Sequence, residues 1–147
     1  MSTLFASCWR HGRCKTVRYW KDDQGRNAGM TAMLDKDNIG GGTKPDVSVP
    51  GFDSSLGHNR GHLLAAFLGG SNVDPRNFVT MFSRANSPVM RGYELQVSKA
   101  VKGGETVRYT VVAHYDGVSK IPSALTLHAI GSGPNPLLIN VRIPNVP

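Results

Sequence analysis

The strongest constraint in this sequence is a single helical segment that lies between segments of β-strand character. Apolar residues recur in this segment at the spacing of one helical face, namely Val89, Tyr93, Val97 and Ala100/Val101. The glycine pair at 103–104 ends it. Two starts fit the pattern, because Ser87 before Pro88 is a good N-cap signal and Ser83 could also cap the helix.

The segments around the helix have strand composition. Residues 105–115, 125–130 and 137–143 predict three strands of an antiparallel meander. Before the helix, residues 16–20 and 30–34 predict a hairpin, and residues 78–82 predict a short strand. The stretch 35–61 is rich in glycine, proline and serine, and we expect it to be mostly irregular and functional or mobile. The fold class is therefore α+β, with one main helix packed on an antiparallel sheet.

Length and composition indicate one folded domain over residues 1–147, with 1–15 as a loosely ordered N-terminal part of it. Of 147 residues, 39% are hydrophobic and 18% are charged, which excludes a disordered tail. No apolar run approaches the roughly 20 residues that span a bilayer, so we expect no membrane insertion. The first ten residues lack the basic and apolar regions of a secretory signal peptide, so export would need another signal.

The net charge of +7 is unevenly distributed along the chain. Seven basic and three acidic side chains give residues 60–108 a local charge of +4, and residues 1–30 carry +4 as well. Residues 31–59 carry −2. A basic balance favours phosphate-bearing partners, although a solvated basic surface has the same composition.

The two cysteines are too few for a disulfide scaffold. Cys8, His11 and Cys14 have the spacing C-x2-H-x2-C, which could contribute three of the four ligands of a structural zinc site. Free thiols and a short-loop disulfide remain open alternatives.

The polar residues around His62 have the chemistry that phosphodiester hydrolysis needs. A neutral imidazole can take a proton from water near pH 7. On a continuous helix, Asn86, Met90 and Glu94 would form one row that can face the preceding strands. An amide oxygen suits a hard ion such as Mg²⁺, which needs few protein ligands, and Arg60 could place its guanidinium on phosphate.

These residues resemble the DNA/RNA non-specific endonucleases of the ββα-metal, or His-Me finger, class. The likeness rests on Arg60-Gly61-His62-Leu63-Leu64, Leu68-Gly69-Gly70-Ser71, Asp74-Pro75-Arg76-Asn77-Phe78-Val79-Thr80, Asn86-Ser87-Pro88-Val89-Met90 and Glu94. It is similar above all to the C-terminal nuclease domains of bacterial polymorphic toxins. The resemblance implies a ββα-metal finger, a hairpin plus one main helix, packed on the antiparallel sheet.

The resemblance also implies a role for each matching residue. His62 would be the general base, Asn86 the direct metal ligand, and Glu94 the group that orients water on the metal. Asn77 would hold the hairpin and its water network, and Arg60 would bind phosphate or product. The site departs from the pattern at position 59, because many family members have Asp where this chain has Asn59.

Each of these residues also has an ordinary structural alternative. His62 could be a structural histidine, Asn86 a helix cap, Glu94 a solvated helix residue and Asn77 part of a turn. The remaining candidate contacts to nucleic acid are three arginines that could equally be exposed surface residues: Arg76, Arg84 and Arg91.

The sequence and its resemblance together predict a Mg²⁺-dependent, sequence-non-specific endonuclease, with Mn²⁺ as a substitute metal. We expect it to cleave DNA, with RNA as a second candidate substrate, and to act as an antibacterial toxin in the cytoplasm of a target cell. A toxin implies an acidic immunity protein, which would cover residues 60–108. The competing hypotheses are a basic nucleic-acid-binding module without catalysis and a zinc-dependent interaction domain built on Cys8, His11 and Cys14.

Overall fold

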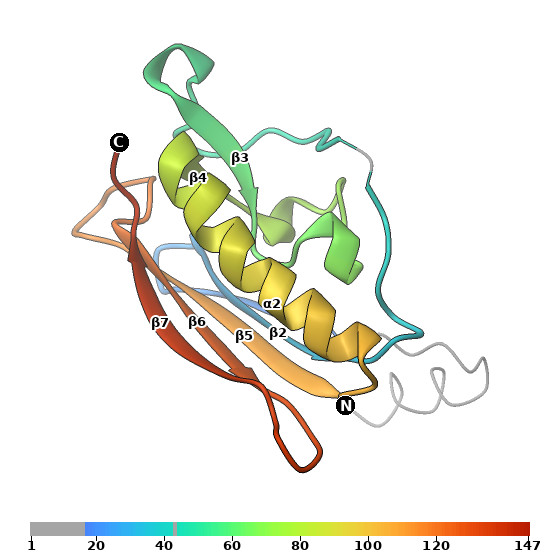
Figure 1. The fold of residues 1–147 in the computed structure, drawn as a ribbon. Helices are drawn as coiled ribbons and strands as arrows, with labels where there is room; N and C mark the ends of the chain where they lie inside the picture. The colour runs from blue at the N-terminus through green and yellow to red at the C-terminus, as the bar shows by residue number, and fades with distance from the viewer. Residues whose placement is uncertain (1–16, 43) are drawn as a thin grey trace.

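The computed structural model describes residues 17–42 and 44–147, and its architecture has a sheet, a hairpin and a helix in three layers (Figure 1). A five-stranded antiparallel sheet has the order β1-β2-β5-β6-β7, and β3 and β4 form a separate two-stranded sheet. The strands are β1 (Val17–Lys21), β2 (Asn27–Leu34), β3 (His58–His62), β4 (Phe78–Phe82), β5 (Val107–His114), β6 (Ala124–Ile130) and β7 (Leu138–Pro144). The main helix is α2 (Arg91–Lys102), preceded by a wide turn η4 (Ala85–Met90), and the short 3₁₀ turns are η1 (Ser54–Leu56), η2 (Ala66–Leu68) and η3 (Pro75–Asn77). The predicted zinc, thiol or disulfide group at Cys8, His11 and Cys14 lies outside the described residues, as does the segment 1–15.

The five-stranded sheet confirms the predicted meander, because β5, β6 and β7 pair antiparallel in chain order. Its inner face carries alternate apolar residues, such as Val111 on β5 and Leu127 on β6, both fully buried. Each such Val or Leu contributes about 1.5–3 kcal/mol relative to an exposed side chain. The predicted N-terminal hairpin joins this sheet, since β2 pairs with β5.

The local sequence pattern did not predict strand β3, because residues 35–61 were expected to be mostly irregular, whereas the hairpin that the family resemblance implied is confirmed. Its sequence, His-Asn-Arg-Gly-His, has no β-branched residue and no apolar alternation, so it carries no strand signal of its own. It forms because β4 offers a full antiparallel ladder, from His58 opposite Phe82 to His62 opposite Phe78. Gly61 permits this close pairing, since a Cβ atom there would lie 2.5 Å from the Met81 side chain.

The helix begins later than a continuous helical row would require. Ser87 has extended dihedral angles (φ −151°, ψ 121°), which separates Asn86 from α2. The predicted row of Asn86, Met90 and Glu94 along one continuous helix is therefore wrong. Of the two predicted starts, Ser87 with Pro88 fits the backbone, and the Ser83 hydroxyl instead donates to the Gly57 carbonyl.

The predicted buried face of the helix is confirmed at Val97 and Val101, with Tyr93 and Ala100 packed against the core, and it fails only at Val89. Met90, Val97 and Val101 are fully buried against the sheet, whereas Val89 is 37% exposed. The break at Ser87 explains the exposure of Val89, because Val89 lies in the wide turn before the regular helix begins. Glu94 lies on the buried side of α2 among these apolar residues.

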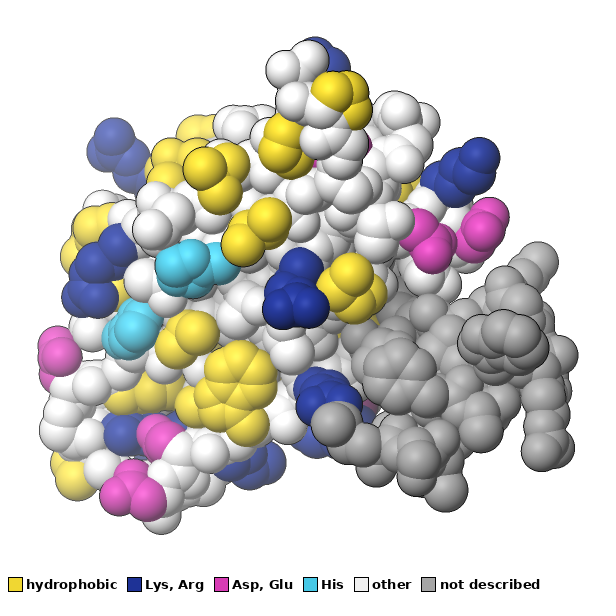
Figure 2. All heavy atoms as spheres, turned by 90° about the horizontal axis from the view of Figure 1, so that it is seen from below, with side chains coloured by type: hydrophobic (Ala, Val, Ile, Leu, Met, Phe, Trp, Pro, Cys, Tyr) yellow, Lys and Arg dark blue, Asp and Glu magenta, His cyan; other side chains and the backbone are white. Residues whose placement is uncertain are grey.

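The surface seen from below mixes hydrophobic side chains with Lys, Arg and His, and acidic side chains lie toward its margins (Figure 2). The outward positions of the sheet include exposed Arg108, His128 and Arg142. The positive charge of the chain is thus not confined to the helix and hairpin. Among the described residues, no helix combines the length and the apolar character that a membrane span requires.

Candidate active site

A cavity of about 520 Å³ opens between the start of the helix and the loops that follow β3. The break at Ser87 and the first turns of α2 form one side, and the glycines at 41–42 and residues 65–67 form the other. Four sequence-predicted residues line it, namely His62, Asn86, Arg91 and Glu94. The fold therefore brings a base, an amide, a cation and a carboxylate to one cavity from three separate segments.

His62 occupies the last position of β3, where the strand delivers its ring to the cavity. Its Nε2 atom lies 2.7 Å from the Asn72 Oδ1 atom, and its ring centroid lies 4.6 Å from that of Phe78. An amide oxygen can only accept, so Nε2 carries the proton and Nδ1 keeps its lone pair. Burial lowers the pKa of His62 below 6.5, while the hydrogen bond to Asn72 acts in the opposite direction. The ring is therefore neutral near pH 7, as a general base requires.

Asn72 is a site residue that sequence reasoning missed. It belongs to the turn between β3 and β4, and the residues around it are of the types that turns usually contain. Its role depends on the folded hairpin bringing residue 72 to His62, ten positions earlier in the chain. No local sequence pattern marks that contact.

Asn77 is fully buried and does not line the cavity. The side chain makes three hydrogen bonds: it accepts from the Leu64 N–H at 2.9 Å and donates to the Leu64 and Ser71 carbonyls at 2.9 Å each. Its backbone carbonyl accepts from the Leu63 N–H at 2.7 Å. These bonds tie the segment after His62 to the turn that holds Asn72.

Glu94 is a buried carboxylate at the wall of the cavity. Only 6% of it is exposed, and burial raises its pKa to about 7, although the Arg91 guanidinium pulls the pKa down. Within the described residues its carboxylate makes no hydrogen bond or ion pair. A buried, unpaired carboxylate is costly unless a cation or a donor joins it.

Asn86 lies on the opposite side of the helix break from Glu94. Its backbone carbonyl accepts from the Arg91 N–H, which fixes the residue at the entry to α2. Its side chain caps no helix among the described residues and is only half-buried. The amide oxygen is thus available to a ligand in the cavity.

Comparison with known proteins agrees with this geometry. Residues 7–131 match the family model described as DNA/RNA non-specific endonuclease. The chain belongs to the DNA/RNA non-specific endonuclease family. It is therefore a metal-dependent nuclease that hydrolyses phosphodiester bonds, and its helix, hairpin and sheet are those of a ββα-metal nuclease.

Solved structures extend the comparison. NucA from Streptococcus agalactiae with magnesium ion bound is 27% identical, with a TM-score of 0.79, over 90% of this chain and 71% of that one. NucA with no metal bound gives a TM-score of 0.78 over 90% and 72% of the two chains. Sda1 nuclease with bound zinc ion shares the fold, at 19% identity and a TM-score of 0.72 over 89% and 74% of the two chains. A search of curated proteins found no match to this nuclease.

The donors of the nuclease site fit a hard divalent cation. Residues 17–42 and 44–147 contain no cluster of three or more His, Cys, Asp or Glu that could hold a metal. The cavity instead offers oxygen atoms from Asn86 and Glu94, and a cation that keeps several waters needs few protein ligands. The unpaired Glu94 carboxylate is the group that such a charge would stabilise.

The nuclease places the other candidate arginines in different surroundings. Arg91 lines the cavity with its guanidinium 5.4 Å from the Phe67 ring centroid. Arg60 does not line it and lies 4.3 Å from the Phe52 ring centroid. Arg76 is paired with Asp74 at 2.7 Å, and Arg84 is exposed. Of these four arginines, only Arg91 lines the cavity of His62.

Position 59, where this nuclease has Asn, shows an unusual feature. The Oδ1 atom of Asn59 is buried and has no hydrogen-bond partner among the described residues. Nearby His58 is structural, since its Nδ1 accepts from the Asp53 N–H at 3.0 Å and its ring packs edge-on against Phe82.

Proposed function

We propose that this nuclease is a Mg²⁺-dependent endonuclease that cleaves DNA, and RNA as a second substrate, without sequence specificity. The observation that carries the proposal is the single cavity shared by His62, Asn86 and Glu94. The magnesium-bound NucA structure supports the choice of metal, and Mn²⁺, which also favours oxygen ligands, would substitute for it.

In this proposal His62 is the general base. Its Nδ1 lone pair accepts a proton from the attacking water, while Asn72 holds the ring through Nε2. Asn77 acts indirectly, because it fixes the backbone on both sides of that contact. These three residues together set the position and the protonation of the base.

Asn86 would bind the divalent cation directly through its amide oxygen, and Glu94 would orient the water that the cation holds. When bound, the cation supplies positive charge that neutralises the phosphate and the leaving oxygen. Arg91, at the same cavity, binds a phosphate oxygen of the substrate. Arg60, Arg76 and Arg84 would contact flanking phosphates outside the cavity.

Sequence-independent binding follows from contacts to the backbone. Affinity that comes from phosphate contacts carries no base information and falls steeply with salt. The chain's net charge of +7 supports this mode of binding.

The biological setting that we propose is antibacterial. The resemblance to polymorphic-toxin nuclease domains supports delivery into a target cell, where the enzyme degrades nucleic acid in the cytoplasm. The producer would then need an acidic immunity protein that covers residues 60–108, which carry both His62 and Arg91. Two structural neighbours are described as an extracellular endonuclease and an extracellular nuclease, which supports action outside the producing cell.

The test is cleavage of plasmid DNA and total RNA by the purified protein with Mg²⁺, with Mn²⁺ and with EDTA. We expect cleavage that EDTA and His62→Ala abolish, while His128→Ala, which removes an exposed histidine of β6, retains it. Relative rates on the two substrates give the preference between DNA and RNA. Intact substrate in every lane, from a folded protein that still binds DNA, would overturn the proposal and establish a binding module.

A further inference from the structure

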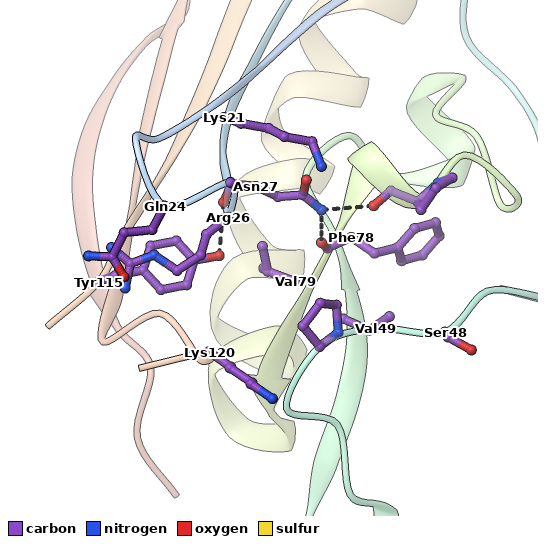
Figure 3. Close-up of a pocket in the computed structure, with 13 residues that line it drawn as sticks. Lys21, Gln24, Arg26, Asn27, Ser48, Val49, Phe78, Val79, Tyr115 and Lys120 are labelled. Carbon is purple, nitrogen blue, oxygen red and sulfur yellow. Dashed lines mark hydrogen bonds between the residues drawn. The ribbon is translucent and has the colours of Figure 1, made fainter. Parts of the chain in front are cut away.

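A second cavity, of about 350 Å³, lies on another side of the catalytic hairpin (Figure 3). It is bounded by the β1–β2 turn, the loop around residues 48–50, the start of β4 and the β5–β6 loop. It shares no lining residue with the cavity of His62. Phe78 lines the second cavity, and its ring centroid lies 4.6 Å from that of His62.

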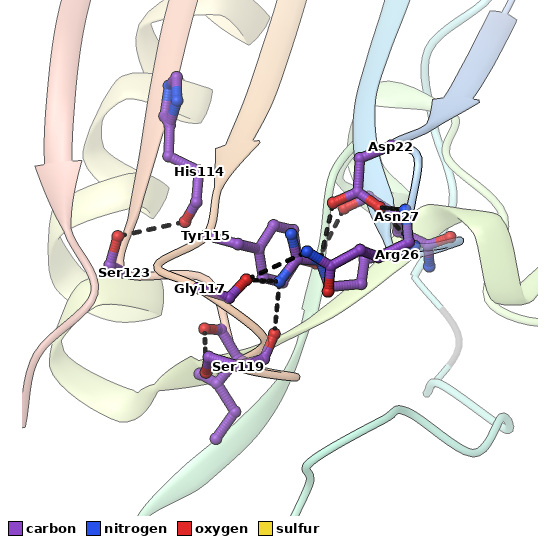
Figure 4. Close-up of polar contacts among 10 residues, drawn as sticks. Asp22, Arg26, Asn27, His114, Tyr115, Gly117, Ser119 and Ser123 are labelled. Atoms are coloured by element: carbon purple, nitrogen blue, oxygen red, sulfur yellow. Dashed lines mark hydrogen bonds and ion pairs between the residues drawn. The ribbon is translucent and has the colours of Figure 1, made fainter.

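One wall of this pocket is fixed by a polar network (Figure 4). The Arg26 guanidinium pairs with Asp22 at 2.7 Å and donates to the Gly117 and Ser119 carbonyls at 2.8 and 3.0 Å. It also lies 4.4 Å from the centroid of the Tyr115 ring. The β1–β2 turn is therefore tied to the β5–β6 loop, so the wall is formed before any ligand binds.

A second set of bonds ties the same wall to the catalytic hairpin. The Asn27 amide donates to the carbonyls of Pro75 and Phe78, each at 2.8 Å. The Tyr115 hydroxyl donates to the Asn27 carbonyl at 2.8 Å. Ligand sites are usually preformed in this way, and their volumes begin at about 300 Å³.

The charge that remains in the pocket is positive. No acidic side chain lines it, and Asp22 neutralises Arg26. Lys21 and Lys120 are exposed, form no ion pair within the described residues, and lie on opposite sides of the pocket in Figure 3. Two unpaired ammonium groups at one opening match the charge of a phosphate group.

The floor of the pocket is apolar. Phe78, Val79 and Val49 are 1%, 3% and 8% exposed, and they form its base. Ser48 and Gln24 add polar groups at the edge. An apolar floor, a few polar groups and a cationic opening suit a flat ring that carries a sugar and a phosphate.

We propose that this pocket binds one nucleotide unit, with the phosphate at Lys21 and Lys120 and the base over the apolar floor. The unit is either a free mononucleotide or a nucleotide within a nucleic-acid strand. The proposal rests on the nuclease function only for the supply of such units, since hydrolysis of a phosphodiester leaves a terminal phosphate.

The test is calorimetric binding of 5′-dAMP, deoxyadenosine and inorganic phosphate in EDTA, where no cleavage occurs. The lysine double variant K21A/K120A should bind 5′-dAMP at least about ten-fold more weakly, because two charge-assisted contacts are lost. The matched control K36A/K102A removes two exposed lysines elsewhere and should bind like the wild type. Deoxyadenosine and inorganic phosphate should each bind at least about ten-fold more weakly than 5′-dAMP, because each lacks one half of the ligand.

Two results would overturn the proposal. One is equal 5′-dAMP affinity in the lysine double variant and the wild type. The other is inorganic phosphate binding as tightly as 5′-dAMP, which would reduce the site to an anion site. This binding assay needs neither metal nor turnover. Its result can therefore be interpreted even if the protein does not cleave nucleic acid.

The source of the nucleotide is read with two oligonucleotides that differ only at the 5′ end. Preference for the 5′-phosphorylated strand, lost in K21A/K120A, supports capture of a terminal or free nucleotide. Equal binding of both strands, weakened in K21A/K120A, supports a unit within the strand. A filling variant, Ser48→Phe, should weaken binding in either case, because Ser48 lines the pocket and forms no hydrogen bond within the described residues.

Discussion

The five-stranded sheet and the hairpin–helix unit bury very different side chains. Along the inner face of β5 and β6 the buried positions are apolar apart from Tyr109. The hairpin–helix unit instead buries polar groups, and five of the six buried polar or charged residues lie on it: His58, Asn77, Thr80, Glu94 and Ser98. The sixth, Asn145, bonds to β4, since it accepts from the Phe82 N–H and donates to the Thr80 carbonyl.

This contrast separates the two tasks of the molecule. Apolar burial is non-directional and gives the sheet stability without fixing any one side chain. Buried polar groups must be satisfied by specific partners, so they hold atoms at defined places. Damage to the sheet should therefore lower stability, and damage to the hairpin–helix unit should lower activity.

The largest effect should follow His62→Ala. Loss of a positioned general base lowers kcat by about 10²–10⁴-fold. The half-buried ring makes one hydrogen bond outside the sheet, so the melting temperature should change little. Steady-state kinetics and thermal melting of the same sample test this. A similar fractional loss in His128→Ala would contradict the assignment of the base.

Leu127→Ala should give the opposite result. This side chain is fully buried on the inner face of β6, and its truncation should cost about 2–5 kcal/mol of unfolding free energy. Activity per folded molecule, measured well below the melting point, should stay within about two-fold of wild type. Urea unfolding gives the first quantity and kcat the second. A large loss of kcat in the folded protein would show that the sheet and the site are coupled.

Asn77→Ala should lower both the unfolding free energy and kcat. It therefore tests how far stability and activity are separated between the sheet and the hairpin–helix unit. It removes three hydrogen bonds, two of them buried, and leaves the Leu64 and Ser71 backbone groups unpaired, which should cost about 2–4 kcal/mol. Because the Asn72 turn then loosens, kcat should also fall. Asn140→Ala, on exposed β7, is the matched control. If stability falls while kcat is retained, Asn77 has no positioning role.

The same contrast explains what could be predicted from sequence. Strands β5, β6 and β7 alternate apolar and polar residues, so their pattern alone predicted the meander. Strand β3 has no such pattern, because its place is set by backbone pairing with β4. His62, Asn86 and Glu94 were predicted from their chemistry and the family resemblance, and the structure brings all three to one cavity.

Contacts between distant segments could not be predicted. The hydrogen bond of Asn72 to His62 depends on how the turn folds back, and the break at Ser87 moved Asn86 off the helix. The pocket of Lys21 and Lys120 is formed by segments that lie about one hundred residues apart in the sequence. Such pairings arise from tertiary packing and leave no local periodicity.

The pH dependence of kcat should show whether His62 limits activity in acid. Protonation removes the lone pair of His62, so kcat should fall about ten-fold per pH unit below its pKa. Because burial lowers that pKa, the midpoint of the acidic limb should lie below 6.5. A pH–rate profile at saturating metal tests this. A midpoint above 6.5 would contradict the assignment of this limb to His62.

The smallest effects should come from the arginines, and they should still differ between positions. Arg91→Ala should weaken binding of a long duplex several-fold and lower the slope of log affinity against log salt by about 1, because Arg91 reaches the catalytic cavity. Arg76→Ala should change affinity by less than about two-fold, since Asp74 already holds its guanidinium at 2.7 Å. Binding titrations in EDTA at several salt concentrations measure both. If both variants lose the same affinity, the substrate binds through the overall positive charge of the surface, and Arg91 makes no specific contact with it.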